Sequence, residues 1–249
     1  MQVNKTGKNS KTIKFIIGIA VAAVVPLSFF FITRQFSDGK IKIPAYFRPE
    51  MDQQDHVITV KRVRKGETFL DTVYHKVKDI TLTNQLGKRV SLNNDLRGKI
   101  LVIDFIFTNC PTVCPRLSAN MSEIQKAYIK KNPELVQFIS ISIDPARDSV
   151  PALRAYADRF NADHDRWCFL TGDSKAIFDY AKEELGVTLQ PSEANDGSFD
   201  HSTKVVLLDT ARNIRGRNDE YYNGMDRKDT KQIADDIYIL SVEKRKDEK

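Results

Sequence analysis

Cysteine is scarce in this chain, with three in 249 residues. Three are too few for a disulfide framework at this length, so any chemistry they carry has to come from their spacing. Proline and glycine are also few, at 9 and 11, while apolar residues make up 41% of the chain. This composition excludes collagen-like, low-complexity and wholly disordered chains, and the length allows one domain of ordinary size with additions.

Acidic residues are absent from residues 1–33, which hold four lysines. The whole chain carries 39 Lys and Arg against 33 Asp and Glu, a net charge of +6, so that +2 remains for residues 34–249. Because nucleic-acid binding requires a basic excess on the folded part, we expect this chain not to bind nucleic acid. No G-x-G-x-x-G or Walker pattern is present, so we also expect no nucleotide cofactor.

A charge-free apolar run from Phe15 to Thr33 is long enough to cross a bilayer as a helix. No small-x-small cleavage site follows it and polar residues do not recur at helical spacing, which favours an uncleaved anchor over a signal peptide or a core helix. The lysines before the run favour a cytoplasmic N-terminus. No transit-peptide pattern precedes it. The expected location is therefore the bacterial inner (cytoplasmic) membrane, single-pass, with the soluble domain on the periplasmic side.

The chain divides by composition into five parts. We predict a basic N-terminal tail over residues 1–14, a transmembrane anchor over 15–33, a stalk over 34–56, one folded domain over 57–242 and a charged tail over 243–249.

Within the domain, apolar runs of strand length alternate with stretches of helical spacing. This order predicts an α/β fold with a mixed central sheet flanked by helices. The expected strands are 77–82, 87–92, 100–107, 135–143, 167–170, 204–209 and 214–217, and the expected helices are 115–131, 150–160, 174–185 and 229–242.

Two cysteines lie where the strand expected at 100–107 runs into a helix. Cys110 and Cys114 are four residues apart at the helix start, so they can share one face, and the amides and dipole there stabilise thiolates. Two structural core cysteines are the less favoured interpretation, because prolines and polar residues interleave with them at a turn where side chains reach the surface. Such a pair can exchange as a disulfide or hold a soft metal such as Cu(I).

A copper or zinc ion would need a third ligand, and imidazole is the usual supplement. The chain has four histidines. His56 and His75 lie in or near the segment next to the stalk, and His164 lies in a polar turn. His201 follows the polar stretch Gln190–Asp200 and opens a strand, so a flexible loop could bring it over the cysteines. Taken alone, a histidine in such a position is more often a solvent-exposed side chain than a metal ligand.

Four segments together closely resemble the Sco/SenC family, namely FTNCPTVCP, SISIDPARDS, WCFLTGD and DHSTKVVLLD. The resemblance also reaches ITLTNQLGKRVSLNNDLRGKILV and IRGRNDEYYNG, so it covers about residues 77 to 240. The C-x-x-x-C-P turn combined with a distant D-H-S is much more specific than either piece. Members of this family are membrane-anchored copper proteins with a thioredoxin-like fold that serve cytochrome c oxidase assembly, and the resemblance implies the same fold here.

The resemblance also implies a metal site. By this carry-over, Cys110, Cys114 and His201 bind one copper ion per chain, as Cu(I) or Cu(II), and the two cysteines can form a disulfide. Asp144 and Asp148 occupy the D-P-x-x-D of the family. Roles as turn and helix-cap residues fit these two at least as well as a direct copper role.

Three residues depart from or add to the family pattern. Asn109 stands where many members have a histidine directly before the first cysteine. Cys168 is an extra cysteine that we interpret as a strand-core residue, with a redox role as the minor alternative. Asp104 lies six residues before Cys110, a spacing similar to that of thioredoxins. A desolvated carboxyl there would have a raised pKa and could relay protons, and an edge-facing acid fits equally well.

Three functions follow from these observations. The favoured one is a metallochaperone that takes copper from a donor protein and passes it by ligand exchange to the copper-bearing subunit of cytochrome c oxidase, with the 190–200 loop as the moving element. The alternative is a thiol-disulfide oxidoreductase of the cell envelope that acts on cysteines of the copper acceptor, with Cys110 and Cys114 as the redox-active pair and Asp104 as a proton relay. A peroxidase is the weakest candidate, because Thr108 lies one residue too close to Cys110 for a T-x-x-C motif.

Overall fold

The computed structural model describes residues 14, 15, 18, 22–31, 44–64, 66–129, 134–191, 199, 200, 202–217 and 220–247. The chain forms two units, Met1–Lys42 and Ile43–Lys249. Residues 22–31 of the first unit are helical, and the rest of the anchor expected at 15–33 lies largely outside the described residues. Over the described part of the chain, no helix combines the length and the apolar character needed to cross a bilayer.

The second unit is built on a mixed sheet with the strand order β1-β12-β11-β6-β7-β8-β4-β5, and β13 pairs with β11. Its central strands β6, β7 and β8 are parallel, whereas β11 runs antiparallel to β6. The strands are β1 (Ala45–Tyr46), β4 (Thr81–Asn84), β5 (Arg89–Ser91), β6 (Ile100–Ile106), β7 (Val136–Ser142), β8 (Trp167–Thr171), β11 (Lys204–Leu208), β12 (Ile214–Gly216) and β13 (Tyr222–Asn223).

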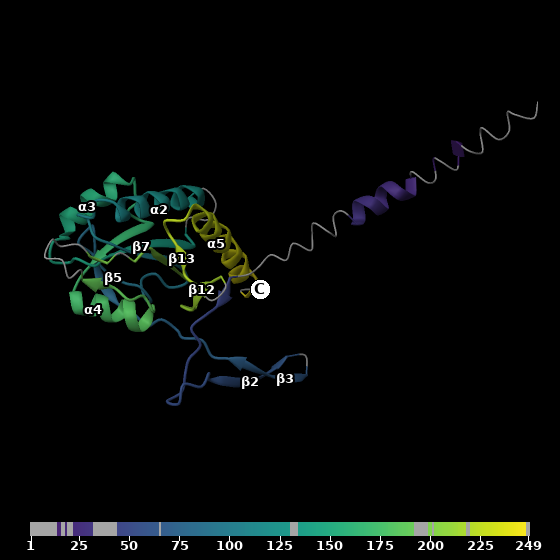
Figure 1. The fold of residues 1–249 in the computed structure, drawn as a ribbon, viewed down its shortest axis with the longest axis horizontal. Helices are drawn as coiled ribbons and strands as arrows, with labels where there is room; N and C mark the ends of the chain where they lie inside the picture. The colour runs from purple at the N-terminus through teal and green to yellow at the C-terminus, as the bar shows by residue number, and fades with distance from the viewer. Residues whose placement is uncertain are drawn as a thin grey trace, which may run out of the picture. The chain divides into compact units, whose positions relative to one another are not determined.

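Every residue of β6 and β7 is buried, which is why β6 is apolar except for Asp104 and β7 is apolar at four of its seven positions. Helices cover both faces of the sheet: α2, α3 and α5 lie on one side and α4 on the other (Figure 1). The helices are α2 (Val113–Ile129), α3 (Val150–Arg159), α4 (Ser174–Asp179), the π-helix η1 (Tyr180–Glu184) and α5 (Arg227–Asp247). The predicted mixed sheet with flanking helices is confirmed.

Several helix boundaries differ from the sequence prediction, and the first one described here matters for the site. α2 begins at Val113 rather than at residue 115, so Cys114 lies in its first turn. The segment expected as one helix over 174–185 changes from α-helix to π-helix at Tyr180. α5 continues through Asp247, well into the range expected as a charged tail.

Of the stalk expected over residues 34–56, residues 34–43 lie outside the described residues, and the described remainder takes part in the fold. Ala45 and Tyr46 form β1, which pairs with β12, and Phe47 is buried in the core. The domain therefore begins earlier than residue 57. A strand of two residues is too short to give a periodic pattern, which is why the sequence did not indicate it. All buried core residues of the described chain lie between Phe47 and Leu240, so the unit Ile43–Lys249 contains its own complete core.

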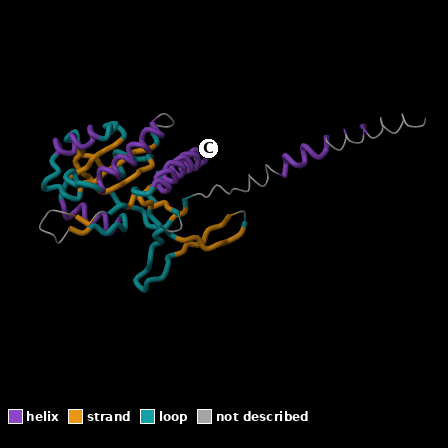
Figure 2. Tube along the Cα trace, turned by 45° about the horizontal axis from the view of Figure 1, so that its top comes forward, coloured by secondary structure: helices purple, strands orange, loops and turns teal. Residues whose placement is uncertain are grey.

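Two hairpins lie outside the main sheet. β2 (Thr59–Arg64) pairs with β3 (Glu67–Thr72), and β9 (Gln190–Pro191) pairs with β10 (Phe199–Asp200). The first hairpin is drawn in Figure 2 as two orange strands standing apart from the sheet. The second brings the two ends of the polar loop before His201 together.

Candidate metal centre

The two cysteines lie at the point where the central strand β6 passes into α2. The amide of Cys110 donates to the carbonyl of Phe107 at 3.3 Å, which closes the turn after the strand. The amide of Cys114 donates to Sγ of Cys110 at 3.2 Å. The first helical turn has amides with no partner inside the helix, and here a sulfur accepts one of them.

Both cysteine side chains are buried, with 5% and 2% exposure for Cys110 and Cys114, and all three cysteines are in the thiol form. The expectation that side chains of this turn reach the surface is therefore wrong for the two sulfurs. Burial raises the pKa of the Cys114 thiol, and the interactions of this thiol with Cys110 and Asp104 act in the same direction. Cys114 therefore keeps its proton until a cation or a disulfide replaces it.

Asp104 is a fully buried carboxyl in the middle of the sheet, with no exposed surface. Its Oδ1 accepts a hydrogen bond from the Ser140 hydroxyl at 2.5 Å, and that hydroxyl accepts one from the indole of Trp167 at 2.9 Å. Within the described part of the chain, Oδ2 has no partner. Burial raises the pKa of Asp104 to about 7. The desolvated interpretation is thus the right one, and the edge-facing one is wrong because β6 lies between β7 and β11.

Asp148 braces the turn that carries the cysteines. Its carboxylate accepts hydrogen bonds from the Thr108 amide at 3.2 Å and from the hydroxyls of Thr108 and Ser142 at 2.5 Å each. Asp148 therefore joins the ends of β6 and β7. The helix-cap interpretation is wrong for its side chain, since Ser149 is the N-cap residue of α3 and makes no side-chain cap bond. Burial raises the pKa of Asp148 despite these donors.

Asp144 acts as a turn residue. Its amide donates to the Ser142 hydroxyl at 3.1 Å, its carbonyl accepts from the Asp148 amide at 2.9 Å, and its carboxylate pairs with Arg147.

The brace between Asp148 and Thr108 was not anticipated from the sequence. Its signal is a hydroxyl residue just after one buried strand and an acid just after the next parallel strand, because the ends of such strands meet at one edge of the sheet.

Cys168 points to the face of the sheet opposite to the one on which Cys110 and Cys114 lie. Asp104, Ser140 and Phe169 are register partners across β6, β7 and β8 and so share one face. Cys168 precedes Phe169 and points the other way, because side chains alternate along a strand. Its thiol accepts from the Gln137 amide at 3.5 Å, and burial raises its pKa to about 11. The strand-core interpretation of Cys168 is confirmed.

His201 lies outside the described residues, but the chain on both sides of it is described. Asp200 pairs with Gln190 in the β9–β10 hairpin. β11 begins three residues after His201 and runs antiparallel to β6, so its first residues lie at the end of the sheet where β6 leads into Cys110. The amide of Gly224 donates to the Thr203 carbonyl at 2.8 Å.

Gly224 links this segment to the cysteine-bearing helix. Its carbonyl accepts from the Asn120 side chain of α2 at 2.7 Å. A Cβ added at Gly224 would lie 2.1 Å from Cδ1 of Leu117 and 2.8 Å from Cγ2 of Val205, so only glycine permits this close approach. The segment after His201 is therefore held against α2, one turn beyond Cys114.

The other three histidines have partners of their own. His75 contacts Glu184 at 3.0 Å, His164 contacts Gln85 and Asp158 at 3.1 and 2.9 Å, and His56 lies 3.4 Å from Asp52. Within the residues that the structure describes, no three His, Cys, Asp or Glu side chains gather as a metal site.

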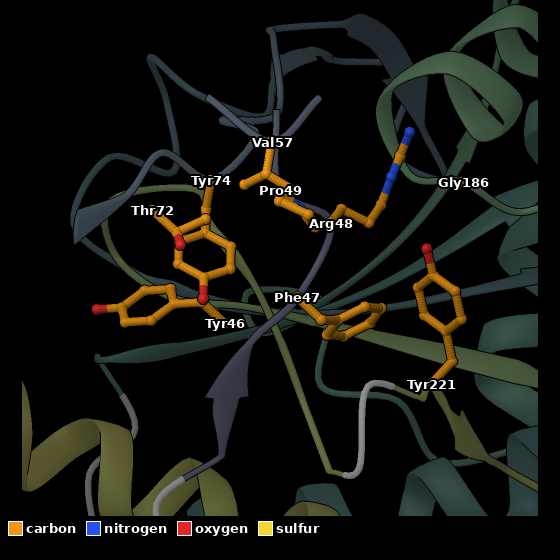
Figure 3. A pocket seen from close by; sticks show the side chains of 9 residues that line it. All are labelled: Tyr46, Phe47, Arg48, Pro49, Val57, Thr72, Tyr74, Gly186 and Tyr221. Atoms are coloured by element: carbon orange, nitrogen blue, oxygen red, sulfur yellow. The ribbon is translucent and has the colours of Figure 1, made fainter. Parts of the chain in front are cut away.

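A cavity of about 680 Å³ lies away from the cysteines. Figure 3 shows it between two aromatic pairs, Tyr46 with Tyr74 and Phe47 with Tyr221, whose ring centroids are 5.2 and 4.9 Å apart. Arg48 lines one side of it and donates to the carbonyls of the η1 residues Glu183 and Glu184. None of the lining residues belongs to the cysteine turn. Most of its lining residues lie between Tyr46 and Tyr74, near the start of the domain.

Comparison with known proteins identifies the family. The SCO1/SenC family model matches residues 71–237. The SCO1 protein homolog of Bacillus subtilis (strain 168) is 31% identical over 178 residues, which are 71% of this chain and 89% of that protein. Among solved structures, BsSco, described as a Sco-family cytochrome c oxidase assembly protein with a disulfide switch, matches with a TM-score of 0.58 and 30% identity over 68% of this chain and 94% of that one.

A second solved structure adds a ligand. ScoI of Bradyrhizobium japonicum, solved with copper bound, matches with a TM-score of 0.55 and 27% identity over 66% of this chain and 99% of that one. The family model covers the main sheet apart from β1, the helices up to the middle of α5 and the cysteine turn, and the resemblance found in the sequence motifs is confirmed together with the thioredoxin-like fold. The chain belongs to the SCO1/SenC family.

Proposed function

We propose that this protein binds one copper ion per chain and delivers copper to, or matures the copper site of, cytochrome c oxidase. The observation that supports this most directly is the buried dithiol at the start of α2, where two soft sulfur donors meet at a helix N-terminus. The copper-bound ScoI and the oxidase-assembly relative BsSco support the same function. Copper is the cargo of such a protein, so its residues bind and release the ion and break no bond of a small substrate.

The proposed ligands are Cys110, Cys114 and His201. The antiparallel pairing of β11 with β6 supports the third ligand, since it brings the start of β11 to the end of the sheet where the cysteine turn begins. Each thiol that binds the ion gives up its proton. Because burial and nearby negative charge raise the pKa of Cys114, a cation with affinity for sulfur is needed to displace this proton near neutral pH. A single imidazole on a loop would supply a ligand that is readily exchanged with an acceptor.

Copper titration tests this site. The reduced unit Ile43–Lys249, which contains its own core, should bind about one copper per chain, and Cys110→Ser and Cys114→Ser should each abolish tight binding. His201→Ala should weaken binding by at least about tenfold while the two cysteines still form a disulfide. The matched control is His164→Ala, which removes a histidine with hydrogen-bond partners of its own. Equal copper affinity in wild type and His201→Ala would rule out the three-ligand site.

A second candidate function is thiol-disulfide exchange on cysteines of the copper acceptor. The buried Asp104, with a pKa raised to about 7 and an electrostatic effect on Cys114, supports it because a carboxyl that changes protonation near neutral pH can accept the proton of an attacking thiol. Reduction of a model disulfide should then slow in Asp104→Asn and persist in His201→Ala. Wild-type protein with no exchange activity at micromolar concentration would eliminate this function.

We also propose that residues 15–33 anchor the protein in the bacterial inner membrane with the domain on the periplasmic side. The charge-free sequence of this segment and the four lysines before it support the proposal. Membrane fractions washed with alkaline carbonate should retain the full chain and release the unit Ile43–Lys249. Recovery of the full chain in the soluble fraction would refute the anchor.

A further inference from the structure

The hairpin of β2 and β3 is a two-stranded sheet that no other described strand joins. In Figure 1 it extends away from the layers of the domain. An isolated two-stranded hairpin is marginally stable in water, and stable ones pack against another surface. Because no other described strand pairs with this hairpin, we compared its two faces as possible binding surfaces.

The two faces differ in charge. Residues directly opposite each other in an antiparallel pair share a face, and side chains alternate along each strand. Both acids of the hairpin, Glu67 and Asp71, therefore fall on one face, where Arg62 pairs with Asp71 at 2.9 Å. We call the other face the acid-free face; it consists of Thr59, Lys61, Val63, Thr68, Leu70 and Thr72.

The acid-free face also exposes more apolar surface. Val63 and Leu70 are 71% and 66% exposed, whereas Val60 and Phe69 on the opposite face are 39% and 41% exposed. Lys61 lies directly across from Leu70. Exposed aliphatic side chains beside a lysine, flanked by hydroxyl residues and free of acids, have the composition of an element that lies at the surface of an anionic bilayer.

The chain itself limits how far this face can be from a membrane. The ten residues 34–43 between the proposed anchor and the domain span at most about 35 Å when fully extended. β1 follows at Ala45, and β2 begins at Thr59. With the proposed anchor in the bilayer, the start of the domain therefore stays within about 35 Å of a lipid surface, whereas a soluble protein partner would have to be recruited.

We propose that the acid-free face of the β2–β3 hairpin docks on the anionic lipid surface of the membrane that holds the anchor. This inference rests on the proposed anchor and is independent of the copper site. Val63 and Leu70 enter the headgroup region, and Lys61 interacts with anionic lipid. The opposite face, with its acids, stays in water.

The single tryptophan of the chain makes a direct test possible. Trp167 has no exposed surface, so its emission is a baseline that lipid cannot quench. The full chain is reconstituted in nanodiscs of phosphatidylcholine and phosphatidylglycerol with brominated acyl chains, which quench tryptophan on contact. Leu70→Trp on the acid-free face should lose most of its added emission, and the matched control Phe69→Trp, the adjacent residue on the other face, should keep it.

Each outcome separates the hairpin from the anchor. Co-elution of the chain with the nanodiscs shows that the anchor is inserted in the bilayer. Quenching of the introduced tryptophan shows that the hairpin contacts lipid. Co-elution without stronger quenching of Leu70→Trp than of Phe69→Trp overturns the hairpin proposal and leaves the anchor standing, and loss of co-elution overturns both. Val63→Trp provides a second probe of the same face, and its quenching should weaken in discs without phosphatidylglycerol. Equal quenching of both faces would also overturn the proposal.

Discussion

Replacing the buried carboxyl of Asp104 by an amide should change how the stability of the domain depends on pH. Burial raises the pKa of Asp104 to about 7 from an ordinary value of 3.8. Below pH 4 the carboxyl is protonated in the folded and the unfolded chain alike. Between about pH 4 and 7 the folded protein keeps a proton that the unfolded chain has lost, so the free energy of unfolding falls as pH rises through this window and levels off above 7.

The size of the effect follows from the same values. At 1.36 kcal/mol for each pH unit, the window from 3.8 to about 7 corresponds to about 4 kcal/mol, and the part between pH 5 and 8 to about 3 kcal/mol. Asp104→Asn removes the titration and keeps an oxygen for the Ser140 hydroxyl, at the cost of burying an amide NH₂ where Oδ2 has no partner among the described residues.

Urea unfolding of the reduced unit Ile43–Lys249 at pH 5, 6, 7 and 8 measures this directly, with the emission of buried Trp167 as the signal. Between pH 5 and 8, the free energy of unfolding of the wild type should fall by about 3 kcal/mol more than that of Asp104→Asn. The variant should be less stable than the wild type at pH 5, and the difference in stability should shrink as the pH rises. Histidines and other carboxyls affect both proteins equally. Parallel stability curves for the two proteins would refute the assignment of a raised pKa to Asp104.

Three further substitutions test the surroundings of the site by the same unfolding assay. Asp148→Asn weakens the brace on Thr108 and should cost about 2 to 3 kcal/mol; unchanged stability would show that the brace does not hold the turn. Gly224→Ala should cost about 1 to 3 kcal/mol, because its Cβ would lie 2.1 Å from a methyl group of Leu117, and a neutral effect would contradict this close approach. Cys168→Ala should leave the redox midpoint of the dithiol and the copper stoichiometry unchanged, since its side chain points to the opposite face, and a shifted midpoint would disprove that placement.

Much of the fold could be predicted because its elements carry strong local signals. The buried strand β6 is an apolar run interrupted only by Asp104, β7 is apolar at Val136, Phe138, Ile139 and Ile141, and α2 shows its inward face at Leu117 and Met121. Such patterns follow from burial on both faces of a strand or along one stripe of a helix. The short strand β1 and the β2–β3 hairpin gave no such signal, since one has two residues and the other is exposed on both faces.

The candidate site could be predicted only in part. The spacing of Cys110 and Cys114 after a buried strand indicated a dithiol at a helix start, and the structure has it there. The burial of both sulfurs and the contacts of Asp148 with Thr108 depend on which strands lie side by side, which no local pattern encodes.

The order of the amino acids specifies the chemical groups that this protein has available: two thiols at the end of a central strand, an acid within that strand, and the motifs of the SCO1/SenC family. The protonation and accessibility of these groups depend on how the chain folds around them. Whether the Asp104 carboxyl is charged depends on its neighbours across β7 and α2, and whether Cys168 can meet the other thiols depends on the face to which it points. Both are set by contacts between residues far apart in the chain, because desolvation and strand register arise only when the sheet has closed around them.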